Sequence, residues 1–419
     1  MAEITSLITI ASDLKKKAAS YHVEQFNKSN FFQENIKKKL AKLSATGREY
    51  LIPMLLGDNQ SFKGSLEGED LATPGTAIWD EVALSRKYTD ARLSITDQAM
   101  QVSKGNEASW IQARTMEERG LMREFNQKYS ELWYGWGTGA IARVNGAPGN
   151  TTFVVDDDQA TGAGYTFGTK YLKKGMVISA SSTLTGYVAD RTFKATIEGV
   201  NNTTLTITVS NCQDLADGDY ILWEDSLNRM PTGLMGIIDD GTFVATYGGK
   251  TRATAGNEWL HGYVYDVNGA ITENRLITTA HTVEQNIGVI PTLAVTTYGG
   301  LRAVANLFVG DRRFMISETT AGGIGYKGGW SGVSIQLGSM KKLNILTDRK
   351  CPKGNMFMPN LEDFVIYQLG EPHWLSMDGE SVYRWVPNKR AWEAAWVYDC
   401  EFFSERPMAS ARLHRITES

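Results

Sequence analysis

The sequence has few cysteines, with three in 419 residues, at Cys212, Cys351 and Cys400. They are too few and too scattered for a disulfide framework or for a structural zinc site with Cys-x-x-Cys spacing. The chain also lacks an apolar stretch long enough for a membrane-spanning helix, and its start, MAEITSLITIASDLKKKAAS, lacks the features of a secretory signal. We therefore expect no membrane partner and synthesis in a reducing cytoplasm.

An excess of positive charge is also absent, because 43 basic residues face 47 acidic ones and the formal net charge is -4. This balance excludes a protein whose affinity depends on neutralising many phosphates, so any contact with DNA is expected to be weak and non-specific. The hydrophobic content of 42% with 10% aromatics is sufficient for burial, and 419 residues exceed what one core usually organises. A composite globular protein is predicted.

Catalytic and metal-binding motifs are missing as well. The sequence contains no HExxH or HxH pair, no GxSxG elbow, no GxxxxGK[ST] phosphate loop and no GxGxxG between a strand and a helix. Neighbouring carboxylates are common in a chain with 47 acidic residues and nominate no acid–base pair. The sequence therefore predicts no enzyme, no catalytic residue, no metal and no cofactor. The histidines are widely separated, at His22, His261, His281, His373 and His414.

The first segment has helical spacing. Apolar residues at three- and four-residue steps predict helix over residues 5–43, and a basic cluster, Lys37, Lys38 and Lys39, lies within it. We interpret that cluster as a solvated helix face, with a contact to acidic neighbours or DNA as the alternative.

The next segment predicts a protruding arm. Residues 50–56 form a short apolar strand, residues 57–75 a polar, glycine-studded excursion, and residues 88–97 alternate as a half-exposed strand does. Together they predict a long two-stranded arm. Because an isolated two-stranded ribbon is marginal in water, a neighbouring subunit is the expected surface for it.

Residues 107–136 predict one long helix that stops at the glycine-rich GWGTGA, and its aromatic end, Trp133, Tyr134 and Trp136, is interpreted as core packing. Residues 144–225 are rich in strand and turn signals and predict a small all-β insertion. The run Asp156 to Asp158 inside it lacks the ligand spacing of a calcium loop, so we interpret it as a solvated turn. Beyond residue 226 helices and strands mix: the pattern predicts a helix over residues 271–288, a strand over 292–297 and a helix over 298–310.

The order of these segments resembles the Hong Kong 97-type capsid fold of tailed bacteriophages. YLIPMLLGDNQSFKG through KYTDARLSIT resembles its extended loop, and ELWYGWGTGAIARV resembles the end of its spine helix. NEWLHGYVYDVNGAITENRLITTAHTVEQ and GGWSGVSIQLGSMKKLNILTDRKCPKGNMFMPN resemble its axial domain, including a D-x-x-x-P segment at Asp348 and Pro352. AAWVYDCEFFSERPMASARLHRI resembles the final peripheral strands.

The resemblance implies an α+β chain with an inserted β domain. Its parts are an N-terminal arm (1–46), an extended loop as a two-stranded arm (47–105), the spine helix of the peripheral domain (106–143), the insertion (144–225), the axial domain with part of the peripheral domain (226–360), and a return to the peripheral domain (361–419).

The implied function is that of a major capsid protein that self-assembles as hexamers and pentamers into an icosahedral head shell around double-stranded DNA. Because only residues 1–46 precede the extended loop, a separate scaffolding protein is expected, together with portal and decoration or head-completion proteins. Assembly would occur in the host cytoplasm, and the mature protein would reside in the virion. The alternatives are an encapsulin-like nanocompartment shell and a β-rich tail or adhesion protein.

The resemblance also indicates which residues meet neighbouring subunits. A cross-link between Lys63 and Asn360 of a neighbour is a further implied possibility. The expected inter-subunit contacts are Phe62, Lys63, Leu66, Glu67, Glu69, Asp70, Lys37, Lys38 and Lys39.

Overall fold

The protein is a mixed α+β chain, here in a computed structural model that describes residues 36–40, 49–96, 107–157, 165–307, 333–336, 342–376, 382–387 and 390–418. It divides into two compact units. The first unit comprises residues 1–130, 245–259 and 364–405, and the second comprises residues 131–244, 260–363 and 406–419. Each unit is therefore assembled from stretches that are far apart in the sequence.

A six-stranded sheet organises the first unit around one long strand, β21 (Ala391–Ser404). On one side β21 pairs with β4 (Lys87–Thr96). On the other it pairs with β18 (Phe364–Gln368), β19 (His373–Trp374) and β20 (Arg384–Trp385).

The sheet also includes a strand where helix was expected. Residues Lys37–Leu40 form β1, which pairs in parallel with β18. The helical prediction is wrong for these residues, because a free sheet edge satisfies their backbone groups irrespective of local period. Residues 1–35 and 41–46 of the expected arm lie outside the described residues.

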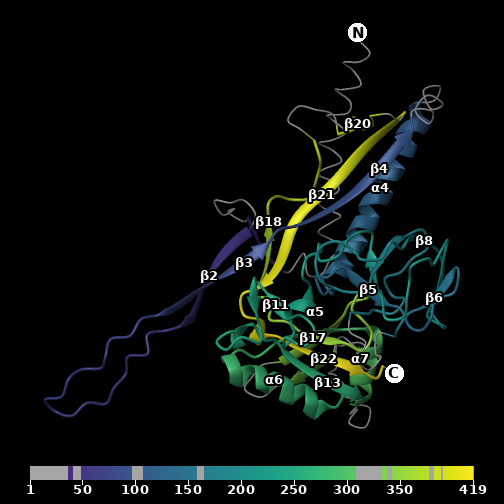
Figure 1. Cartoon of the computed structure of the whole chain (residues 1–419). Helices are drawn as coiled ribbons and strands as arrows, with labels where there is room; N and C mark the ends of the chain where they lie inside the picture. Colours follow the sequence, from purple (N-terminus) through teal and green to yellow (C-terminus); the bar gives the residue numbers. More distant parts are fainter. Residues whose placement is uncertain are drawn as a thin grey trace, which may run out of the picture. The chain divides into compact units, whose positions relative to one another are not determined.

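The predicted long helix is confirmed as α4 (Glu107–Leu132). Figure 1 shows it running alongside β4 and β21. Tyr129 of the helix packs on Tyr398 and Phe402 of β21, with ring centroids 5.2 and 5.5 Å apart. Burial alternates along residues 394–400 of β21, as expected for a sheet with one covered face, and residues 400–404 are buried at every position.

A hairpin leaves this sheet. The strand predicted at 50–56 is confirmed as β2 (Glu49–Gly57), but its partner is β3 (Ile78–Ser85) and not the strand at 88–97. That second strand exists as β4 and belongs to the sheet with β21. The predicted pairing was wrong because alternation identifies a strand without identifying its partner.

The second unit contains a six-stranded antiparallel sheet, five of whose strands lie in the predicted β block of residues 144–225 and one, β5, just before it. Its order is β5-β10-β7-β8-β9-β6, and no α-helix interrupts it between residues 144 and 225 in the described part of the chain. The strands are β5 (Ala140–Arg143), β6 (Thr152–Val154), β7 (Val177–Ser181), β8 (Lys194–Asn201), β9 (Thr206–Val209) and β10 (Tyr220–Trp223).

A second sheet of this unit has the order β13-β22-β17-β14-β16-β15. The helix, strand and helix predicted beyond residue 270 are confirmed as α6 (Glu273–Ile287), β14 (Leu293–Thr296) and α7 (Tyr298–Leu307). Thr272 caps the start of α6, and Gly288 ends it with φ 76°. The other strands are β13 (Tyr263–Gly269), β15 (Val333–Gln336), β16 (Lys342–Thr347), β17 (Met356–Met358) and β22 (Ala411–Ile416).

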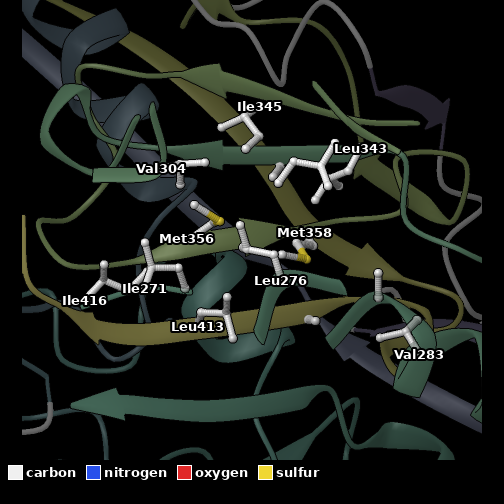
Figure 2. Close-up of a cluster of buried hydrophobic side chains, with 14 of the residues drawn as sticks. Ile271, Leu276, Val283, Val304, Leu343, Ile345, Met356, Met358, Leu413 and Ile416 are labelled. Carbon is white, nitrogen blue, oxygen red and sulfur yellow. The ribbon is translucent and has the colours of Figure 1, made fainter. Parts of the chain in front are cut away.

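Figure 2 shows the core of this sheet, where Leu276 and Val283 of α6 lie beside Met356, Met358 and Leu413. All five side chains are fully buried. The last strand, β22, pairs with β13 and β17, so residues 406–419 belong to the second unit, whereas residues 364–405 belong to the first.

Short elements complete the chain. They are α5 (Leu234–Ile237), β11 (Thr246–Tyr247), β12 (Lys250–Thr251) and the 3-10 turns Glu258–Leu260 and Pro407–Ala409. None of the helices in the described residues combines the length and the apolar character that crossing a bilayer requires.

Candidate subunit-interaction surface

The most exposed apolar feature is the hairpin arm, which we define as β2, the loop 58–77 and β3. In Figure 1 the loop extends as the long purple excursion beyond β2 and β3. Its residues are exposed to solvent almost without exception. An excursion of this length in a structured chain is usually functional.

The strands of the arm are apolar on both faces. On one face Tyr50, Ile52 and Val82 are buried, with 1%, 9% and 0% exposure. On the other face Leu55 is paired directly with Trp79, and these two side chains are 49% and 64% exposed. A face with large exposed apolar side chains on a rigid strand pair is typical of an interaction surface.

Contacts with the β11–β12 turn hold the arm at its base. Lys250 Nζ lies 2.7 Å from Asp80 Oδ1, and the Ala83 amide donates to the Gly248 carbonyl over 3.1 Å. The hydrogen bond from Lys250 holds the pKa of Asp80 below its ordinary value. Burial raises the pKa of Tyr50, on the inner face of β2, to about 12.

Hydrogen bonds within the loop give it a defined course. Asn59 Nδ2 donates to the Gly75 carbonyl over 2.8 Å and closes the loop near its base. Further out, Lys63 Nζ donates to the Asp70 carbonyl over 3.1 Å and lies 3.4 Å from the Glu69 carboxylate. The polar groups are thus used inside the loop, whereas the apolar side chains point to solvent.

Three apolar side chains are strongly exposed on this loop. Phe62 is 96% exposed, Leu66 77% and Leu71 88%. Such exposure is unfavourable in water, because full burial of one such side chain would stabilise the protein by roughly 1.5–3 kcal/mol. The loop therefore presents apolar contacts with no cover from the described parts of its own subunit.

The predicted contact residues fall into three groups. Lys63, Glu69 and Asp70 are connected by the hydrogen bond and ion pair described above, and Phe62, Leu66 and Glu67 are exposed on the same loop. The side chains of Lys37, Lys38 and Lys39 lie outside the described residues, although their backbone is in β1.

Asn360, the other predicted cross-link partner, is half-buried in the second unit. Its amide Nδ2 donates to Asp363 Oδ2 over 2.7 Å. The amide is therefore engaged within its own subunit, and the cross-link to Lys63 stays a prediction.

Sequence reasoning missed the exposed strand residues Leu51, Leu55 and Trp79. The signal was present, since LIPMLL places apolar residues at consecutive and not alternate positions, which is typical of a strand covered on both faces. Only the structure reveals that one of these faces is open.

A buried polar cluster fixes the D-x-x-x-P segment of the second unit. Tyr134 Oη donates to Asp348 Oδ2 over 2.7 Å, and Tyr171 Oη donates to the Lys350 carbonyl over 2.6 Å. Lys350 Nζ is also bound to the carboxylate of Glu131, whose side chain is 1% exposed. Burial together with the neighbouring Cys351 and Asp348 raises the pKa of Tyr134, which keeps this phenol protonated as a donor.

No group of three histidine, cysteine, aspartate or glutamate side chains could hold a metal ion among the described residues. In the aspartate run, Asp157 lies 3.8 Å from Lys353 Nζ, and Asp158 falls outside those residues. Burial raises the pKa of Asp156, which disfavours its charged form.

Comparison with known proteins finds similarity at the level of solved structures. No model of a known protein family matches the chain, and no curated protein sequence does. The chain is similar to one in the cyanophage A-1(L) capsid asymmetric unit, with 12% identity, 91% of both chains covered and a TM-score of 0.48. For the capsid of the native GTA particle, the identity is 9%, the coverage 92% of this chain and 89% of that chain, and the TM-score 0.45.

An encapsulin is also among the similar structures. For the holo-SrpI encapsulin complex from Synechococcus elongatus PCC 7942, the identity is 7%, the coverage 91% of this chain and 85% of that chain, and the TM-score 0.38.

Proposed function

We propose that this chain is the major capsid protein of a tailed bacteriophage, which assembles as hexamers and pentamers into an icosahedral shell around double-stranded DNA. The observation that carries the proposal is the hairpin arm. It displays apolar side chains on a loop ordered by its own hydrogen bonds, and the described parts of its own subunit do not cover them.

The energetics of the arm fit a repeated, modest contact. Burying Phe62, Leu66, Leu71, Leu55 and Trp79 on a neighbour would gain on the order of 10 kcal/mol, from about 1.5–3 kcal/mol for each side chain. Association costs about 4–15 kcal/mol, so one such contact gives weak binding. Many copies arranged by symmetry convert weak contacts into a stable shell.

Other parts of the proposal rest on the sequence resemblance. A separate scaffolding protein, a portal and head-completion proteins would be the partners during assembly in the host cytoplasm, and the virion would be the final location. The net charge of -4 fits a shell that meets its DNA by weak, non-specific contacts. An encapsulin-like shell would use the same arm, and the contents of purified particles distinguish the two: nuclease-protected DNA supports the capsid, and a protein cargo without DNA contradicts it.

Deletion of residues 58–75 tests the role of the arm. The shortened chain should fold, because β2 and β3 keep their paired register and their anchor on β11–β12. We expect capsomers or free subunits and no closed shells, measured by size-exclusion chromatography and negative-stain microscopy with the scaffold present.

A finer variant retains the loop and replaces Phe62, Leu66 and Leu71 by serine. The matched control replaces Gln60 and Thr73 by serine, which alters the same loop without removing apolar area. The triple variant should lose shell closure and the control should assemble normally. Normal particles from both the deletion and the triple variant would show that the arm does not join subunits.

A further inference from the structure

Strand β4 lies at the open edge of the sheet in the first unit. Its residues 87–96 pair with β21 in an unbroken antiparallel register, from Lys87 with Cys400 to Thr96 with Ala391. In the described part of the chain, no strand pairs with the opposite edge of residues 88–95. Figure 1 shows β4 beside β21 along most of its length. A long edge of this kind offers unpaired backbone groups to another strand.

Charged side chains often protect such an edge, and β4 carries charges on its open face. Tyr88, Asp90, Arg92 and Ser94 are exposed, whereas Thr89 and Leu93 alternate with them and are buried. Charges of a single sign would repel a second copy of the strand. Asp90 and Arg92, however, have opposite signs and are two residues apart on one face.

This spacing makes the strand complementary to itself. If two copies of β4 pair antiparallel about Ala91, Asp90 lies opposite Arg92 of the second copy, and Arg92 lies opposite its Asp90. A register centred on residue 90 or on residue 92 instead places like charges opposite each other. A shift by one residue would turn the exposed face of one copy to the buried face of the other.

We infer that the free edge of β4 binds the β4 edge of a second copy across a two-fold axis, with Ala91 facing Ala91 and two Asp90–Arg92 pairs flanking it. The inference rests on the proposed function, because it takes the partner to be another shell subunit. An opposite-charge pair across two strands is individually weak, so this contact operates together with the hairpin arm and not alone.

A cysteine scan tests the geometry directly. Paired residues across an antiparallel ladder have Cβ atoms about 4.5–5.5 Å apart, close to the separation in a disulfide, so Ala91→Cys should form covalent dimers when assembled particles are oxidised. Ser94→Cys is the matched control, because the two copies of residue 94 are offset by roughly 20 Å along the strands. The native cysteines, Cys212, Cys351 and Cys400, are buried and should not interfere.

The expected result is a dimer band on a non-reducing gel for Ala91→Cys and a monomer band for Ser94→Cys. Equal cross-linking of the two variants, or none for Ala91→Cys in particles that have assembled, would overturn the inference and leave the proposed function standing. Ala91→Cys dimers from a chain that never forms particles would support the pairing and contradict the proposed function.

A charge exchange provides a second measurement. Asp90→Arg places arginines opposite each other in both flanking pairs and should raise the concentration needed for assembly several-fold. Adding Arg92→Asp restores opposite charges and should return that concentration toward the original value. Arg92 also lies 3.3 Å from Glu393 of its own chain, and Arg92→Asp removes this ion pair. Thermal unfolding of unassembled subunits measures the stability lost with that pair and so separates it from the effect on the interface. A double variant that assembles worse than Asp90→Arg, at unchanged subunit stability, would contradict the register.

Discussion

Glu131 is an acidic residue whose charge is disfavoured by its position in the fold and stabilised there by lysine side chains. It lies in the last turn of α4, where the helix dipole disfavours negative charge, and its side chain is 1% exposed. Lys350 Nζ binds its carboxylate, and Lys173 Nζ lies 3.7 Å from Oε1. The ion pair therefore offsets both burial and the dipole.

Replacing Glu131 by glutamine should lower the free energy of unfolding by about 2 kcal/mol, because Lys350 keeps a charge that is only 14% exposed and loses its partner. Relief of the dipole contact reduces the loss slightly. Denaturant titration of the unassembled subunit measures this. Glu69→Gln removes an exposed pair with Lys63 and should change stability by less than about 1 kcal/mol. Equal effects of the two variants would mean that the buried pair contributes no more to stability than the exposed pair does.

At the residue scale, the sequence predicted burial correctly where residue type and local surroundings determine it. Trp133, Tyr134 and Trp136 were interpreted as core residues, and each is at most 6% exposed. The partner of Glu131 was not predictable, since Lys350 is 219 positions away and pairing at that separation has no local signal. Phe62 and Leu66 were named as contact residues from the resemblance, and the structure leaves both exposed.

At the scale of elements, the β11–β12 turn illustrates why a glycine is required. Gly248 has φ +59°, and a Cβ at this position would overlap Cγ1 of Val82 on the hairpin arm. Its carbonyl also accepts the amide of Ala83. The turn can hold the arm closely because residue 248 has no side chain.

Gly248→Ala should therefore loosen the arm at its base and destabilise the subunit by about 1–3 kcal/mol, from left-handed backbone strain and the overlap with Val82. Amide hydrogen exchange in β2 and β3 should become faster than in the unaltered chain, by a larger factor than exchange in β21. Gly370→Ala is the control, because its φ is not positive and no atom lies within 4 Å of the added carbon. Unchanged exchange in β2 and β3 would contradict the anchoring role.

Element types were more predictable than element partners. The helices α4, α6 and α7 and four strands of the β block, β7 to β10, followed from periodicity and turn signals, because these are local properties. Pairing is not local: β2 joins β3 and β4 joins β21, although β4 shares the alternating pattern expected of the arm's second strand. The same limit applies to β1, whose four residues lie in a segment with helical spacing and yet pair with β18.

At the scale of the whole molecule, the order of segments predicted the mixed α+β class but not the path of the chain between units. Residues 245–259 lie in the stretch expected to hold the axial domain with part of the peripheral domain, and they belong to the first unit, where β11 and β12 contact the hairpin arm. Each unit is closed by strands from the C-terminal region, β21 in one and β22 in the other. Composition and order cannot specify such returns, because they depend on long-range pairing.

The balance of charge and apolar surface predicts how the chain assembles in different salts. A net charge of -4 is small, so repulsion between copies is modest, and the exposed apolar side chains of the hairpin arm should dominate association. Sulfate strengthens apolar burial more than chloride does, so sodium sulfate should lower the assembly threshold below that in sodium chloride of equal ionic strength. Light scattering against protein concentration measures the threshold.

Trp79→Ser should reduce the difference between the salts, because this side chain is 64% exposed on the arm. Identical thresholds in both salts for the unaltered chain would indicate that charge pairs, and not the apolar arm, drive assembly.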